Sequence, residues 1–110
     1  RHGETSRLDL GSETGPPLCA LGDFPYTSGQ RQLQPADTLC LFTDGVTEAS
    51  NGQQMFGSAA LLECLAAQAS SAGTGDIVKA VQQAVRKFES GHPASDDLTL
   101  LVLRWNGPLL

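Results

Sequence analysis

The sequence is poor in basic residues and in cysteine, and each shortage excludes a class of function. It has 7 Lys or Arg against 12 Asp or Glu, which gives a net charge of -5. We therefore expect no nucleic-acid partner, because phosphate binding needs clustered cations. The three cysteines are widely spaced and odd in number, which argues against both a zinc site and a disulfide framework. We expect them to be small buried apolar residues: Cys19, Cys40 and Cys64.

Long apolar runs are also missing. No stretch approaches the ~20 apolar residues that a membrane helix requires, and no apolar segment typical of a signal peptide follows the first residues. We therefore expect no membrane partner and a cytoplasmic location. The apolar content of 40% and the length of 110 residues suit a single small folded domain. Because the sequence does not begin with methionine, we expect residues 1–110 to be part of a longer protein.

Two apolar runs predict the main strands. Residues 38–43 are rich in strand formers and lack strict alternation, which predicts a strand buried on both faces. Residues 98–104 predict a last, largely buried strand. Residues 6–10 and 31–34 predict two shorter strands, and residues 35–37 a tight turn fixed by proline. With the helices described next, this pattern predicts an α+β fold.

Two helices are predicted between the main strands. The first has Ser58 as its N-cap and an apolar face of Leu61, Leu62, Leu65, Ala66 and Ala69. The second has Thr74 as its cap and Asp76 in its first turn, where the helix dipole favours negative charge. Its buried face is predicted from residues that recur at helical spacing: Ile77, Val78, Val81, Ala84, Val85 and Phe88. We expect Lys79, Gln82, Gln83, Arg86 and Lys87 to face outward.

The segment at residues 43–49 places an acid, Asp44, directly after a predicted strand. At the end of a sheet its carboxylate can point into a cleft, and Gly45 lets the backbone turn sharply. Taken alone, Asp-Gly is more typical of a simple turn.

Two adjacent acids, Asp96 and Asp97, stand directly before the last predicted strand. If the two main strands are antiparallel, Asp44 and Asp96 lie at the same edge of the sheet. Like charges about 5 Å apart repel by roughly 3 kcal/mol at an effective dielectric near 20. A hard divalent cation, which prefers carboxylate oxygens, removes this penalty. A solvated loop remains the ordinary alternative, and His2 and His92 are weaker candidates for a general acid.

Several motifs occur in a fixed order: Gly15-Pro16-Pro17-Leu18, Leu33-x-Pro35-x-Asp37-Thr38-Leu39, Thr43-Asp44-Gly45-Val46-Thr47-Glu48-Ala49, Phe56-Gly57 and Asp96-Asp97-Leu98-Thr99. This series resembles the bacterial metal-dependent protein phosphatases of the stage II sporulation protein E type, in the PPM superfamily. The resemblance covers nearly the whole chain. It implies an αββα sandwich of two antiparallel sheets flanked by helices, with residues 1–110 as the C-terminal portion of a single phosphatase domain.

The resemblance also implies an activity, the hydrolysis of phosphoserine or phosphothreonine in regulatory phosphoproteins of signal transduction. Water activated by two Mn²⁺ or Mg²⁺ ions would carry it out. By position Asp44 and Asp96 correspond to catalytic metal ligands, Asp97 to a supporting residue at the metal, and Gly45 to supporting backbone.

One part of the family pattern is missing. The family's metal-bridging Asp belongs to an earlier Asp-Gly-type motif that residues 1–110 lack, so we expect the isolated chain to be inactive. The resemblance also makes an upstream regulatory domain an expected partner. It further implies that helices in this region respond to neighbouring domains, so we expect residues 48–56, which join Asp44 to the first helix, to transmit the position of that helix to the metal site. Unpaired sheet edges predict a homodimer. The alternative function is a non-catalytic binding or regulatory module on the same fold.

Overall fold

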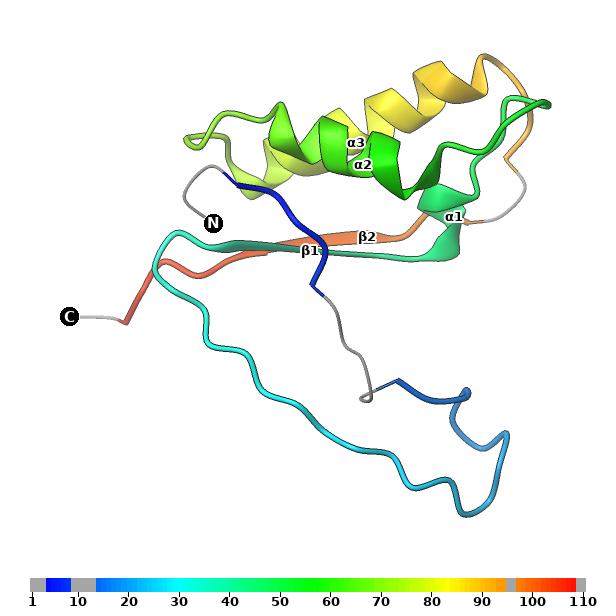
Figure 1. Ribbon diagram of the computed structural model, residues 1–110. Helices are drawn as coiled ribbons and strands as arrows, with labels where there is room; N and C mark the ends of the chain where they lie inside the picture. Colours follow the sequence, from blue (N-terminus) through cyan, green and yellow to red (C-terminus); the bar gives the residue numbers. More distant parts are fainter. Residues whose placement is uncertain (1–3, 9–13, 95–96, 109–110) are drawn as a thin grey trace.

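The computed structural model describes residues 4–8, 14–94 and 97–108. Its elements follow in the order β1 (Thr38–Phe42), α1 (Asp44–Thr47), α2 (Gly57–Ala66), α3 (Thr74–Glu89) and β2 (Leu100–Arg104). This mixture of helices and an antiparallel sheet confirms the α+β prediction, with two longer helices between the two strands (Figure 1). No helix in the described ranges is long and apolar enough to cross a membrane.

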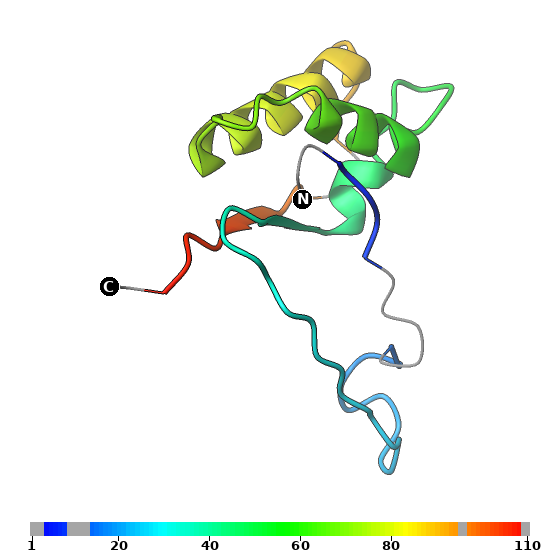
Figure 2. The same cartoon turned by 60° about the vertical axis from the view of Figure 1, so that its left-hand side comes forward.

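The sheet pairs the two predicted main strands. β1 and β2 run antiparallel, with Cys40 opposite Val102 and Phe42 opposite Leu100. Helices α2 and α3 lie together on one side of this sheet, and residues 14–37 run away from it on the other side (Figures 1 and 2). The sheet therefore has a face covered by helices and a face that the helices do not cover.

Helix α3 follows its predicted pattern closely. The Asp76 carboxylate accepts a hydrogen bond from the Gly73 N–H (3.1 Å), which satisfies one of the free donors at the helix start. The N-cap is therefore Gly73, one residue before the predicted Thr74. Ser90, with φ 51°, adopts the left-handed conformation that ends the helix. The predicted outward residues are exposed: Lys79, Gln82, Gln83, Arg86 and Lys87.

The core lies between the helices and the single turn of α1. Phe56 packs edge-to-face on Phe88, with ring centroids 5.6 Å apart, and Leu65 packs against the core cluster from α2. Leu62 and Val78 are half-buried, whereas Ala66 and Ala69 are exposed, so the predicted face of the first helix was too wide. Burying these apolar side chains is the main source of stability. The cluster consists of Val46, Ala49, Phe56, Leu61, Val81 and Val85.

Residues 38–43 were predicted to be buried on both faces and residues 98–104 to be largely buried, and both predictions are wrong. On the face turned away from the helices, Leu41, Leu101 and Leu103 are 48%, 58% and 46% exposed. Leu39, opposite Leu103 in the register, shares this face and is half-buried. We call these four residues the leucine face. It is exposed because no second layer covers it within the described part of the chain.

The shorter predicted strands do not form in the described residues. Residues 6–8 and 31–34 have no strand structure, because neither alternating pattern finds a neighbouring strand there; residues 9 and 10 lie outside the described part. The predicted turn at residues 35–37 is confirmed. Asp37 is buried and its carboxylate accepts the Gln34 N–H at 2.8 Å, while Ala36 has φ 74°.

Candidate metal site at the end of the sheet

The two acidic motifs meet at one end of the β1–β2 ladder. Thr43, directly after β1, donates its N–H to the Thr99 carbonyl at 3.2 Å. Thr99 donates its own N–H to the Thr43 hydroxyl at 3.3 Å. These two bonds extend the pairing of β1 and β2 by one residue of each strand, at the end of the sheet next to α1. We call the contact between residues 43–45 and residues 97–99 the junction.

Asp44 is held at the junction by a short helix. It is the first residue of α1, which turns the chain as soon as β1 ends. The next turn is fixed in the core, since Val46 is fully buried and Ala49 is 3% exposed. The Asp44 side chain is exposed. The local sequence therefore buries the residues after Asp44 and leaves its carboxylate at the surface.

Gly45 is needed for a close backbone approach. A Cβ added there would overlap the Asp97 carbonyl oxygen and lie 2.7 Å from the Asp97 carbonyl carbon and 3.1 Å from the Leu98 Cα. Gly45 lies inside α1 and is not among the glycines with positive φ. The predicted sharp turn is therefore not the reason for glycine here. Its missing side chain allows the two acidic motifs to touch.

The predicted acids are only partly described. Asp96 lies outside the described residues, so its approach to Asp44 stays a prediction. Asp97 is described, exposed and adjacent to Gly45. Among the described residues, no group of three His, Cys, Asp or Glu side chains is arranged to hold a metal. The donors at the junction are nonetheless carboxylate oxygens, the type that Mg²⁺ and Mn²⁺ prefer.

A small cavity of about 170 Å³ opens beside the junction. Gly45 and Asp97 line it together with two residues of α3, Arg86 and Glu89. Glu89 is only 7% exposed, and sequence reasoning missed it. A signal was present, because Glu89 continues the four-residue spacing of Ile77, Val81 and Val85 on the buried face. An acid at a core position of an amphipathic helix is unusual unless it is paired or near a site.

The other polar candidates lie elsewhere. His92 is exposed and its ring comes within 3.4 Å of the position of a Cβ on Gly52, and His2 lies outside the described residues. Burial raises the pKa of the Cys40 and Cys64 thiols, and Cys64 packs against the core cluster as predicted for a small apolar residue. Cys19 is exposed, so the prediction that it is buried is wrong.

The segment between Asp44 and α2 connects the junction to the core. Residues 50 and 55 form an isolated antiparallel bridge, and the Phe56 N–H donates to the Ala49 carbonyl at 2.7 Å. The Asn51 side chain accepts the N–H groups of residues 53 and 54, at 2.9 and 2.8 Å. The segment is thus a closed loop that returns Phe56 to the core beside the residues that follow Asp44.

Comparison with known proteins gives one match. The sequence profile described as stage II sporulation protein E matches residues 1–106. Curated proteins and solved structures gave no match. The profile thus covers both halves of the junction and nearly the whole chain.

Proposed function

Because the chain belongs to the stage II sporulation protein E family, a family of PPM-type phosphatases, we propose that it forms part of a metal-dependent protein phosphatase. Its substrates would be phosphoserine or phosphothreonine residues of regulatory phosphoproteins in the bacterial cytoplasm. The observation that carries the proposal is the junction, where Gly45 contacts the Asp97 backbone. It supports a shared site for the two acidic motifs.

In this proposal Asp44 and Asp96 bind Mn²⁺ or Mg²⁺, and Asp97 supports them. The donor types fit these ions, since all three offer carboxylate oxygens. Such metals lower the pKa of a bound water and neutralise charge on phosphoryl oxygens. The protein's own contribution is positional. The buried turn after Asp44 and the contact of Gly45 with Asp97 hold the two motifs in fixed register.

We also propose that residues 1–110 are inactive alone. Two nearby metal ions need a bridging ligand that offsets their mutual repulsion. The acids in matching motifs are Asp44, Asp96 and Asp97, and none stands in the family's bridging motif. A bridging carboxylate would come from a further segment of a longer protein, where an upstream regulatory domain would act on the site.

The test measures Mn²⁺ binding by calorimetry and phosphate release from a phosphoserine peptide. Asp44→Asn should weaken Mn²⁺ binding by at least about 10-fold, since even changes to outer-shell partners cost 10–100-fold. Asp23→Asn is the matched control, because Asp23 is an exposed acid in residues 14–37. Equal Mn²⁺ affinity of both variants would overturn the metal assignment.

The activity assay compares the 110-residue chain with a longer protein that carries it. Turnover only in the longer protein is the expected result. Comparable turnover in both would show that no further bridging carboxylate is needed. Mn²⁺ binding without turnover in the longer protein would support the alternative of a non-catalytic module.

A further inference from the structure

Glu89, the last residue of α3, places a carboxylate where the surrounding chain does not compensate its charge. The residue is only 7% exposed, and its side chain makes no hydrogen bond or ion pair with any other described residue. Arg86, one turn earlier, is exposed and forms no ion pair within the described ranges. The last turn of a helix carries partial negative charge, which adds to the cost of a buried carboxylate. Glu89 therefore lowers the stability of the chain unless a further group binds it.

The Glu89 carboxylate opens into the cavity beside the junction. In the described part of the chain, every fully buried side-chain nitrogen or oxygen has a hydrogen-bond partner. Because the Glu89 carboxylate has no such partner there, its oxygens are not fully buried and hold the small exposed area of the residue. Glu89 also lines the cavity of about 170 Å³, together with Gly45 and Asp97. The carboxylate oxygens are therefore accessible from this cavity.

The core fixes the position of this carboxylate. Val81 and Val85 precede Glu89 at four-residue spacing on the same face of α3, and they are 0% and 1% exposed. The opposite wall of the cavity is the junction, where the backbone of Asp97 approaches Gly45 closely. Both walls are thus held by packing. Such a charge at a core position breaks the local pattern, and breaks of this kind concentrate at functional sites.

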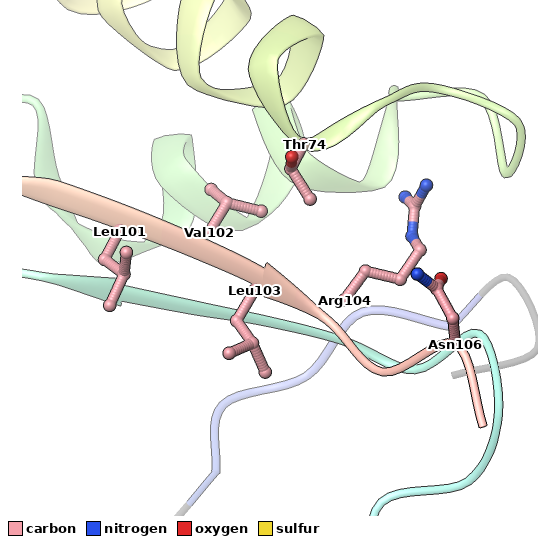
Figure 3. A pocket seen from close by; sticks show the side chains of 6 residues that line it. All are labelled: Thr74, Leu101, Val102, Leu103, Arg104 and Asn106. Atoms are coloured by element: carbon pink, nitrogen blue, oxygen red, sulfur yellow. The ribbon is translucent and has the colours of Figure 1, made fainter. Parts of the chain in front are cut away.

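A larger hollow beside β2 has no comparable group. It encloses about 410 Å³, and in Figure 3 Val102 points toward the start of α3, whereas Leu101 and Leu103 point away from the helices. None of the described residues that line it carries a carboxylate. Its charged side chain, that of Arg104, donates to the Thr38 hydroxyl at 3.0 Å. A cation would therefore find carboxylate ligands in the smaller cavity and not in the larger one.

We propose that Glu89 is a further carboxylate of the metal site and faces a hydrated divalent cation in the cavity that it shares with Asp97. The inference rests on the metal assignment proposed above for Asp44 and Asp96. Mg²⁺ keeps several of its waters and needs only one or two carboxylates from the protein. The cavity has room for several waters, since each needs about 10–15 Å³ of such space. The cation offsets the negative charge that burial leaves uncompensated at Glu89.

The first test compares Glu89→Gln with wild type, in EDTA and in Mn²⁺. In EDTA, Glu89→Gln should unfold at a higher temperature than wild type, because it removes an uncompensated charge and keeps the shape of the side chain. Its Mn²⁺ affinity, measured by calorimetry, should fall by at least about 10-fold. Glu63→Gln is the matched control, since Glu63 is exposed on α2, and it should change neither value. A lower unfolding temperature of Glu89→Gln in EDTA, or an Mn²⁺ affinity equal to that of Glu63→Gln, would overturn the proposal.

Asp44→Asn separates this inference from the metal assignment on which it rests. Weaker Mn²⁺ binding in both Asp44→Asn and Glu89→Gln supports both proposals. If only Asp44→Asn binds Mn²⁺ more weakly, the role of Glu89 is wrong and the metal assignment stands. If only Glu89→Gln does so, the cavity binds the cation and the assignment of Asp44 is wrong. A chain that binds no Mn²⁺ would overturn both proposals.

A measurement on the wild-type chain needs no stable variant. The chain has five glutamates, whose side-chain carboxyl carbons can be labelled with ¹³C and followed by NMR during titration with Mg²⁺. The Glu89 signal, identified by its absence in Glu89→Gln, should shift as Mg²⁺ binds, whereas the Glu63 signal should stay in place. A Glu89 signal that does not move, or that moves only as much as that of Glu63, would contradict a cation at this carboxylate.

Discussion

Gly45 and the backbone of Asp97 are in direct contact, although they are separated by more than fifty residues of sequence that include α2 and α3. A Cβ on Gly45 would lie 2.7 Å from the Asp97 carbonyl carbon, which is closer than non-bonded atoms tolerate. The contact fixes the start of α1 against the approach to β2. The position of Asp44 relative to Asp97 is therefore set by backbone packing, before any ligand is considered.

Gly45→Ala should destabilise the protein by about 1–3 kcal/mol, because the added methyl group overpacks a tight contact. The matched control is Gly75→Ala in the first turn of α3, where an added Cβ meets no atom within 4 Å. In a helix the change from Gly to Ala is otherwise favourable by up to ~1 kcal/mol. Urea unfolding measures both variants. Equal stability of the two would show that the contact with Asp97 relaxes without cost.

Val81→Asp should cost more than about 4 kcal/mol, since it places an unpaired carboxylate in the core. Val81 lies on the buried face of α3 and is fully buried. Gln83→Asp, at an exposed position of the same helix, should change stability by less than about 1 kcal/mol. Thermal unfolding compares the two variants. A well-folded Val81→Asp protein would contradict the assignment of the core.

Phe56→Leu tests whether the closed loop couples the core to the junction. Phe56 contacts Phe88 and follows the loop that begins beside Asp44. Loss of the ring should lower stability by about 1–3 kcal/mol and weaken Mn²⁺ binding measured by calorimetry. Phe24→Leu is the control, because Phe24 contacts Tyr26 in residues 14–37 instead of the core. Unchanged Mn²⁺ affinity in Phe56→Leu would refute the coupling.

The three cysteines should differ in reactivity toward iodoacetamide. Burial, and to a lesser degree the nearby Cys64 thiolate, raises the pKa of Cys40, and burial raises that of Cys64. Because the thiolate is the nucleophile, exposed Cys19 should react first, and Cys19→Ser should remove the fast phase seen by mass spectrometry. Because the pKa of Cys40 and of Cys64 is higher in the folded protein, their neutral thiols contribute to the free energy of unfolding at pH values below the ordinary thiol pKa. This contribution is lost as the pH rises through the folded-state pKa. Fast labelling of Cys64 would contradict its burial.

The predictions from sequence succeeded where a single periodic pattern determined the outcome. The register of Ile77, Val81 and Val85 predicted the buried face of α3, and Asp76 predicted its start within one residue. The apolar run at residues 38–43 predicted β1 within one residue. These features depend on local patterns, and the helices supply the packing partner that each pattern needs.

The predictions failed where the outcome depends on distant partners. The apolar runs did not reveal that Leu41 and Leu101 would be exposed, because burial of the second face requires a layer that no local pattern specifies. The role of Gly45 was missed for a similar reason. An Asp-Gly pair suggests a turn, whereas the contact with Asp97 involves the far end of the sequence. Glu89 could have been predicted to be buried, because it continues the spacing of the apolar residues on the buried face of α3.

The short length of α1 determines how this end of the molecule unfolds. A helix of four residues cannot persist alone in water, so α1 exists only while Val46 and Ala49 remain in the core. Asp44 therefore loses its position in the same cooperative event that melts α2 and α3. Hydrogen exchange at the Val46 amide, which donates to the Thr43 carbonyl at 3.0 Å, should be as slow as global unfolding. The acidic end of the sheet therefore has no melting transition separate from that of α2 and α3.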